Sequence, residues 1–413
     1  MMKINKFAAL AASVLLFGSA SPIFAQDTLT ITGNGENSDN TVTVANTNTN
    51  TVSQNNHAEI NNTVTSNANS GNNSATSNTN GNVTITTGNT STTTNVSNSA
   101  NVNAANLNGC NTCGATGDVT ISGNGENSTN TATIGNAGST NQVFQNNDAK
   151  ISNDINSNTN TGNNIASGNT GGNVGITTGA ATTDTTVANN ANANLARIGG
   201  TTGGTGGLNA TISGNGEGSN NTVSLLNGSS RIISQNNRAM VTNHVTSDAN
   251  TGGNSAISNT NGTVTINTGR ASTTTTVDNS VNFNAADVDC CLTDVSATIS
   301  GNGENSTNTI TDLLGNTLTV WQGGERCSGN LAKLNNPVYS NTTTGNNVVY
   351  SNTGSLTGGL NGVATGSASS DTSVGNWANA NVFGSGLSLT LPSTLPLSFS
   401  FSFDLGGLFG ALV

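Results

Sequence analysis

One pattern of about 90 residues occurs four times along the chain, and this repetition constrains the fold more than any other feature. Each copy opens with Ile-Ser/Thr-Gly-Asn-Gly-Glu and closes with Val-x-Asn-x-x-Asn-x-Asn. The openings start at Ile31, Ile121, Ile212 and Ile299, and the closing motifs at Val96, Val187, Val277 and Val374. The copies span residues 29–107 (repeat 1), 119–198 (repeat 2), 210–288 (repeat 3) and 297–383 (a divergent repeat 4). A fixed period predicts stacked or arrayed structural units.

A finer rhythm within each copy predicts β-structure. Short stretches such as 41–44, 83–86 and 95–98 alternate β-branched with polar residues, which is typical of half-buried strands. Turn-like clusters near Asn37, Asn56, Asn73 and Asn89 lie about 16–19 residues apart. We therefore expect an all-β fold, a β-solenoid with rungs of about 16–19 residues or a string of tandem β-rich repeats.

Composition favours this fold over a row of β-sandwich domains, and the spacing of the repeat favours it over a disordered chain. Hydrophobic residues make up 32% of the chain and aromatic residues 3%, which is too little for four β-sandwich domains with well-filled inner faces. A narrow solenoid needs few apolar side chains per rung, and aligned Asn residues can form hydrogen-bonded ladders along its stack. Asn-rich tracts are often disordered, but the fixed place of Glu in every copy argues against disorder here.

The N-terminus has the order of a secretory signal peptide. Lys3 and Lys6 precede the apolar run 7–17, and Ala25 marks the expected cleavage site, so residues 1–25 are predicted to be removed. The apolar run is shorter than the roughly 20 residues that a transmembrane helix needs. We expect an exported chain with no transmembrane span after cleavage. Its net charge of −11 argues against nucleic acid as a partner.

A resemblance to known proteins rests on the Gln-x-Asn-x-Ala motif, which starts at Gln54, Gln145 and Gln235. In an Asn-, Gly- and Thr-rich exported chain, this motif resembles repetitive bacterial surface proteins of the curli-like, functional-amyloid or β-solenoid type. Curli-type rungs carry Gln-x-Gly-x-Asn-x-Ala in each strand–turn–strand unit, whereas this chain has the motif once per long repeat and lacks the Gly. The resemblance implies a stacked β-structure at a bacterial surface or in a biofilm matrix.

The cysteines are predicted to form disulfides, because the chain is expected to be exported. A Cys-x-x-Cys metal site would need a second pair of ligands nearby. The odd number of cysteines leaves one thiol free or shared with a neighbouring chain. The candidates are Cys110, Cys113, Cys290, Cys291 and Cys327.

No catalytic constellation is found in the sequence. The two histidines, His57 and His244, stand at positions where other copies carry Asp, Arg or Thr, so we expect no enzyme and no cofactor. The glutamate of each Gly-Asn-Gly-Glu turn offers one carboxylate, which makes calcium a weak candidate ligand beside a plain exposed turn. These glutamates are Glu36, Glu126, Glu217 and Glu304.

Two further features suggest association. The segment 384–413 alternates apolar with polar residues, and such a strand can add to the edge of a partner sheet or cap the solenoid end. Its association candidates are Leu397, Phe399, Phe401, Phe403 and Leu405. The fourth copy also holds four aromatic residues that could face a ligand, namely Trp321, Tyr339, Tyr350 and Trp377.

These features predict a structural protein of the bacterial cell surface or extracellular matrix, such as a fibre subunit, a stalk or an adhesin. The expected partner is a second copy or another cell-surface protein. The alternative is a binding module that recognises glycans or a host surface through repeat 4.

Overall fold

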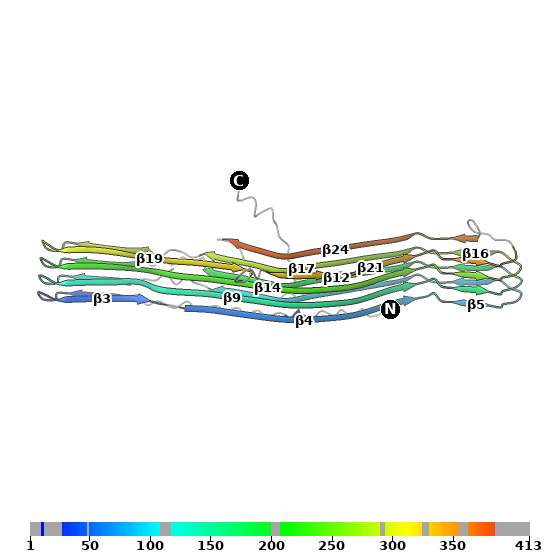
Figure 1. Ribbon diagram of the computed structural model, residues 1–413, viewed down its shortest axis with the longest axis horizontal. Helices are drawn as coiled ribbons and strands as arrows, with labels where there is room; N and C mark the ends of the chain where they lie inside the picture. Colours follow the sequence, from blue (N-terminus) through cyan, green and yellow to red (C-terminus); the bar gives the residue numbers. More distant parts are fainter. Residues whose placement is uncertain are drawn as a thin grey trace, which may run out of the picture.

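The computed structural model describes residues 10–11, 27–47, 49–107, 117–199, 207–289, 294–323, 330–354 and 362–384. All named elements in these ranges are β-strands. Apart from the short β1 (Leu10–Ala11), which pairs with the first layer, they form four layers, one for each sequence repeat (Figure 1).

Each layer follows the same path through its strands. The first layer consists of β2 (Asp27–Thr32), β3 (Asp39–Asn46), β4 (Thr49–Asn69), β5 (Ser74–Thr76), β6 (Val83–Thr86) and β7 (Thr90–Leu107). The second consists of β8 (Gly117–Ser122), β9 (Thr129–Asn160), β10 (Ile165–Ser167), β11 (Val174–Thr177) and β12 (Ala181–Gly199). The third consists of β13 (Gly207–Ser213), β14 (Asn220–Asn250), β15 (Ser255–Ile257), β16 (Val264–Asn267) and β17 (Ala271–Asp289). The fourth consists of β18 (Asp294–Ser300), β19 (Thr307–Gln322), β20 (Leu331–Asn335), β21 (Val338–Thr343), β22 (Val348–Tyr350), β23 (Val363–Ala364) and β24 (Ala368–Gly384).

Strands pair between layers in a parallel register that advances by one whole repeat. Asn147 of β9 lies between Asn56 of β4 and Asn237 of β14, at sequence separations of 91 and 90 residues. Valines 96, 187, 277 and 374 are likewise stacked along β7, β12, β17 and β24. The all-β solenoid class predicted from the sequence is therefore confirmed. Separate β-sandwich domains are excluded, because the sheets run between the repeats.

The predicted rung length of about 16–19 residues is wrong, because one full turn of the solenoid takes a whole repeat. The predicted turns near Asn37, Asn73 and Asn89 are found between strands, but the one near Asn56 is not. The stretch around Asn56 lies inside β4, where the side chain of Gln54 is buried and donates to the backbone oxygen of Ala104 at 3.0 Å. A polar cluster that resembles a turn is here a strand that faces a polar interior.

The layer is a long flattened loop. The chain runs out along β3 and β4 to β5 at the far end (Figure 1), turns through β5 and β6, and returns along β7. Two sheets therefore face each other across a thin interior. From Asp39 to Thr76 the outward run spans about 120 Å at the usual rise of a strand. Four layers at strand spacing are only about 19 Å high. The molecule is therefore much longer along its strands than along its stacking axis.

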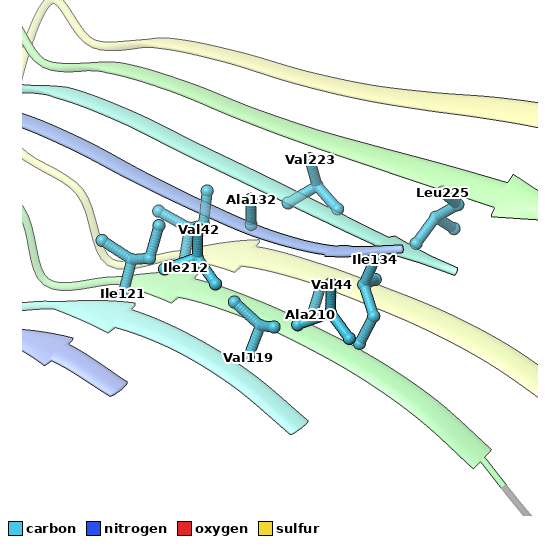
Figure 2. Close-up of a cluster of buried hydrophobic side chains, with 10 residues drawn as sticks. All are labelled: Val42, Val44, Val119, Ile121, Ala132, Ile134, Ala210, Ile212, Val223 and Leu225. Atoms are coloured by element: carbon cyan, nitrogen blue, oxygen red, sulfur yellow. The ribbon is translucent and has the colours of Figure 1, made fainter. Parts of the chain in front are cut away.

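Small apolar clusters alternate with polar zones along this interior. Figure 2 shows one cluster, in which valines, isoleucines and alanines of three successive layers pack between the two sheets. Isoleucines 121, 134 and 212 in this cluster are completely buried. Each further cluster is likewise built from the equivalent positions of successive layers. The chain therefore buries its scarce apolar residues as columns instead of one large core.

Glycines allow the turns to stack at strand spacing. A Cβ atom on Gly162 would lie 2.0 Å from the backbone oxygen of Gly252 in the layer above. The same clash recurs from Gly71 to Gly162 and from Gly252 to Gly345, whereas a Cβ atom on Gly345 would meet nothing within 4 Å. The steric requirement for glycine in this turn therefore ends at the fourth layer.

This difference gives a prediction for stability. Gly162→Ala should lower the free energy of unfolding by about 3 kcal/mol, because the methyl group would push two backbones apart. Gly345→Ala is the matched control and should leave the unfolding of the dilute, isolated chain unchanged. Thermal or urea unfolding followed by circular dichroism measures both. Equal losses in the two variants would contradict the stacking of this turn.

Candidate assembly surfaces of the stack

Asparagine amides connect the layers inside the molecule. In the ladder of Asn98, Asn189, Asn279 and Asn376, each Nδ2 atom donates to the Oδ1 atom of the next layer at 2.7, 2.7 and 2.8 Å. A facing ladder on the opposite sheet runs through Asn62, Asn153, Asn243 and Asn336 in the same direction. The interior between the two sheets is therefore hydrogen-bonded along the stack as well as across it.

Asn189 shows how completely these amides are satisfied. Its Oδ1 atom accepts from Asn98 at 2.7 Å and from Asn153 at 3.0 Å. Its Nδ2 atom donates to Asn243 at 3.0 Å and to Asn279 at 2.7 Å. A primary amide has two donor hydrogens and two acceptor lone pairs, so this buried side chain uses its full capacity.

Most of the ladders share one direction, from the first layer toward the fourth. In the ladder that starts at Asn73, backbone geometry fixes this direction, since the N–H groups of Asn73, Asn164 and Asn254 also donate to the side chain of the next layer, and only its oxygen can accept. The glutamine ladder Gln54–Gln145–Gln235–Gln322 runs the opposite way, as do two shorter asparagine ladders, Asn55–Asn146–Asn236 and Asn69–Asn160–Asn250. Complete ladders in the common direction start at Asn40, Asn62, Asn73, Asn78, Asn98, Asn101 and Asn103.

The two end layers are therefore chemically different. In the fourth layer, no described group accepts from the Nδ2 atom of Asn379 or from the backbone N–H of Asn347. In the first layer, no described group donates to the Oδ1 atoms of Asn73 and Asn101. In the ladders of the common direction, the fourth-layer end presents amide donors and the first-layer end presents amide acceptors.

The fourth layer also carries most of the exposed apolar surface. Val374 is 43% exposed, although Val277 directly below it is completely buried. Of the fourteen large hydrophobic side chains that are exposed among the described residues, eleven belong to this layer. They are Ile310, Leu313, Leu318, Trp321, Leu331, Tyr339, Val348, Tyr350, Val374, Trp377 and Phe383.

The structure does not gather the four predicted ligand-facing aromatic residues into one strip. Trp321 and Tyr339 lie on the sheet of β19 and β21, Tyr350 on the sheet of β22, and Trp377 on the sheet of β24. All four are exposed, and the ring of Tyr339 makes an edge contact with His244 at a centroid distance of 5.9 Å. What they share is their position in the fourth layer.

The predicted calcium residues form a column at the first turn of each layer. The carboxylates of Glu36, Glu126, Glu217 and Glu304 are exposed. The backbone oxygen of Glu126 accepts from the N–H of Asn37 at 2.8 Å, and that of Glu217 from Asn127 at 2.8 Å. Among the described residues, no group of three or more His, Cys, Asp or Glu side chains is placed to hold a metal ion.

The histidines lie at the positions that the comparison of repeats indicates. His57 is paired in register with Asp148, which in turn pairs with Arg238, and the imidazole of His57 lies 3.3 Å from the carboxylate of Asp148. The imidazole of His244 lies 3.0 Å from the carboxylate of Asp154. Both histidines are exposed.

Several predicted features lie outside the described residues. These are all five cysteines, the association residues between Leu397 and Leu405, and the cleavage site after Ala25.

Comparison with known proteins gives no further guide to the site. No protein-family model, curated protein or solved structure matches the chain. The part of the chain that the structure describes also contains no helix long and apolar enough to cross a membrane.

The ladder makes a second prediction. Asn189→Asp keeps the acceptor oxygen but removes both donor hydrogens and buries a charge, so the free energy of unfolding should fall by about 3–5 kcal/mol at neutral pH. Part of this loss should be recovered in acid, because a protonated carboxyl regains one donor. Asn156→Asp, on the exposed outer side of the same layer, is the control and should change little. Equal stability of the two variants at neutral pH would refute the buried ladder.

Proposed function

We propose that the chain is an exported structural protein of the bacterial cell surface or extracellular matrix, serving as a fibre subunit, stalk or adhesin. The observation that supports this most is the single parallel register that runs through all four layers, over an outward run of strands and turns about 120 Å long. Backbone pairing and interior amide ladders act together along this whole length. Such a body resists bending and local unfolding, which suits a mechanical role better than a catalytic one.

We further propose that the chain is not an enzyme. The histidines His57 and His244 pair with Asp148 and Asp154 of neighbouring layers on the exposed outer side, and the equivalent positions elsewhere hold Arg238 and Thr63. A general base has to keep its identity and geometry, and interchangeable surface positions do not provide this.

A binding module is the second candidate. It is favoured by the exposed aromatic side chains of the fourth layer, with Tyr350 at 68% and Trp377 at 60% exposure. Because Trp377 lies on a different sheet from Trp321, Tyr339 and Tyr350, a glycan bound at Trp377 would contact that one of the four alone. Replacing Trp377 with Ala should abolish binding to a glycan array if this candidate is correct and leave the fold intact.

Export gives the direct test of the proposed function. Expressed in a bacterium, the chain should be recovered in the surface or extracellular fraction with Gln26 as its first residue, as measured by intact mass. An uncleaved chain that stays in the cytoplasm would overturn the proposal. A Lys3→Glu, Lys6→Glu variant, which inverts the predicted positive region, should reduce export without changing the folded part.

A further inference from the structure

We propose that the fourth layer is the docking surface for the first layer of a second copy, so that copies stack head to tail in one continuous register. This inference rests on the proposed structural role and specifies the partner and the contact. It places Asn347, Val374 and Asn379 of one copy on Asn73, Val96 and Asn101 of the next.

The first argument is the direction of the ladders. In the seven complete ladders of the common direction, the fourth layer ends in amide donors and the first layer begins with amide acceptors, so head-to-tail contact satisfies both ends of these ladders. Contact between two fourth layers would place donors against donors, and contact between two first layers would place acceptors against acceptors. The chemistry of the ends therefore favours an open stack, in which all copies point the same way, over a symmetric dimer.

Asn379 adds a more specific contact. Its equivalents in the lower layers donate both to the next amide and to a backbone oxygen of the facing sheet one layer above. These oxygens belong to Asp148, Arg238 and Leu331, at donor distances of 2.7, 2.5 and 2.8 Å. In a head-to-tail stack, the corresponding oxygen for Asn379 is that of His57 in the second copy.

The apolar columns give the second argument. Val96, Val187 and Val277 are 5% exposed or less, whereas Val374 at the top of the same column is 43% exposed. Ile310 of β19 and Phe383 of β24 show the same difference, since each is 52% exposed above a completely buried residue, Val223 and Ala286 respectively. Strands β19 and β24 form edges of the two long sheets. A further layer is the one occupant that would continue both the columns and the backbone pairing of those edges.

Glycines at both ends give an independent argument. A Cβ atom on Gly125, Gly216 or Gly303 would lie within 2.4 Å of a backbone nitrogen in the layer below, but Gly35 in the first layer has nothing within 4 Å. At the fourth layer, a Cβ atom on Gly345 likewise has nothing within 4 Å. Neither residue has a positive φ, so nothing within one copy requires glycine there. A second copy stacked on the fourth layer would require glycine at position 345, and a copy stacked on the first layer would require glycine at position 35.

Two residues of the predicted signal peptide occupy part of the first-layer edge that the proposed stack would use. Strand β1 (Leu10–Ala11) pairs in parallel with Ser99 and Ala100 of β7. In the proposed stack this place belongs to Trp377 and Ala378, which are equivalent to Ser99 and Ala100 through the registers of β12 and β17. Removal of residues 1–25 would therefore free this edge for a second copy.

The proposed stack has a characteristic shape. Each copy adds about 19 Å along the stacking axis, and the strands lie across that axis. Growth therefore produces a flat ribbon about 120 Å wide instead of a thin filament.

The test uses the mature chain, residues 26–413, and two glycine variants. Gly345→Ala should block the fourth-layer surface and Gly35→Ala the first-layer surface, so each variant alone should stay monomeric in analytical ultracentrifugation. Both should keep the circular dichroism spectrum and unfolding temperature of the unassembled wild-type chain. Gly315→Ala is the matched control in the fourth layer and should assemble like the wild type, because the second layer already carries Ala137 in that column.

Mixing the two blocked variants separates head-to-tail stacking from symmetric pairing. The intact fourth layer of Gly35→Ala should bind the intact first layer of Gly345→Ala and give one-to-one dimers that grow no further. Dimers formed by either variant alone would overturn the proposal in favour of symmetric pairing.

A charge variant tests the ladder itself. Asn379→Asp keeps the acceptor oxygen that Asn282 uses but removes the donor and faces the oxygen of Asn101 with a carboxylate. It should abolish ribbons, whereas Asn156→Asp on the outer side should not.

Other outcomes would refute stacking without refuting the structural role. An exported chain that is monomeric at every concentration, or that assembles equally well with Gly345→Ala and Gly35→Ala, would overturn the stacking. Assembly of a chain truncated after Gly384, without assembly of the chain 26–413, would overturn stacking as a property of the mature chain. Failure of export, in contrast, would refute the proposed function whatever the purified chain does.

Discussion

The hydrogen bond between asparagine amides of successive layers is the interaction on which the rest of the structure depends. An amide can donate to the layer above and accept from the layer below, so identical side chains satisfy one another when they are stacked in register. Asn103 and Asn194 are completely buried on this basis. A chain with only 32% hydrophobic residues can therefore close an interior that apolar side chains alone could not fill.

The ladders impose a strict register, and other features follow from it. A shift by one residue would move every amide to the outer side and every valine column out of line. The turns must then stack at strand spacing too, which is why Gly162 has no room for a side chain. Asn101 and its equivalents adopt a positive φ near 60°, and asparagine is among the residues that tolerate this conformation best. Asparagine thus supplies both the hydrogen bonds of the ladder and the positive φ that the backbone needs at this position.

The sequence alone predicted the repeat, the strands at 41–44, 83–86 and 95–98, and the stacked all-β class. It did not predict the rung length, because Gln54, Asn55 and Asn56 have the composition of a turn, and only the facing strand shows that two of them point inward. The four aromatic residues were predicted to face a ligand because they all belong to the fourth copy. Trp321 and Trp377, however, lie on different sheets of that layer. Proximity in a long flattened layer is set by the path of the loop and not by sequence distance.

The fourth layer departs from the other three in a selective way. Its outer positions change freely, as Trp321 at the place of Ser234 shows, and its long strand is divided into β19, β20 and β21. Its inner amides are retained at Asn376 and Asn379, although the layer below uses only their oxygens. A carboxylate would accept those bonds as well. The Nδ2 donors of Asn376 and Asn379 have no acceptor among the described residues, and another layer would supply one, so the divergent repeat retains the chemistry of an internal layer.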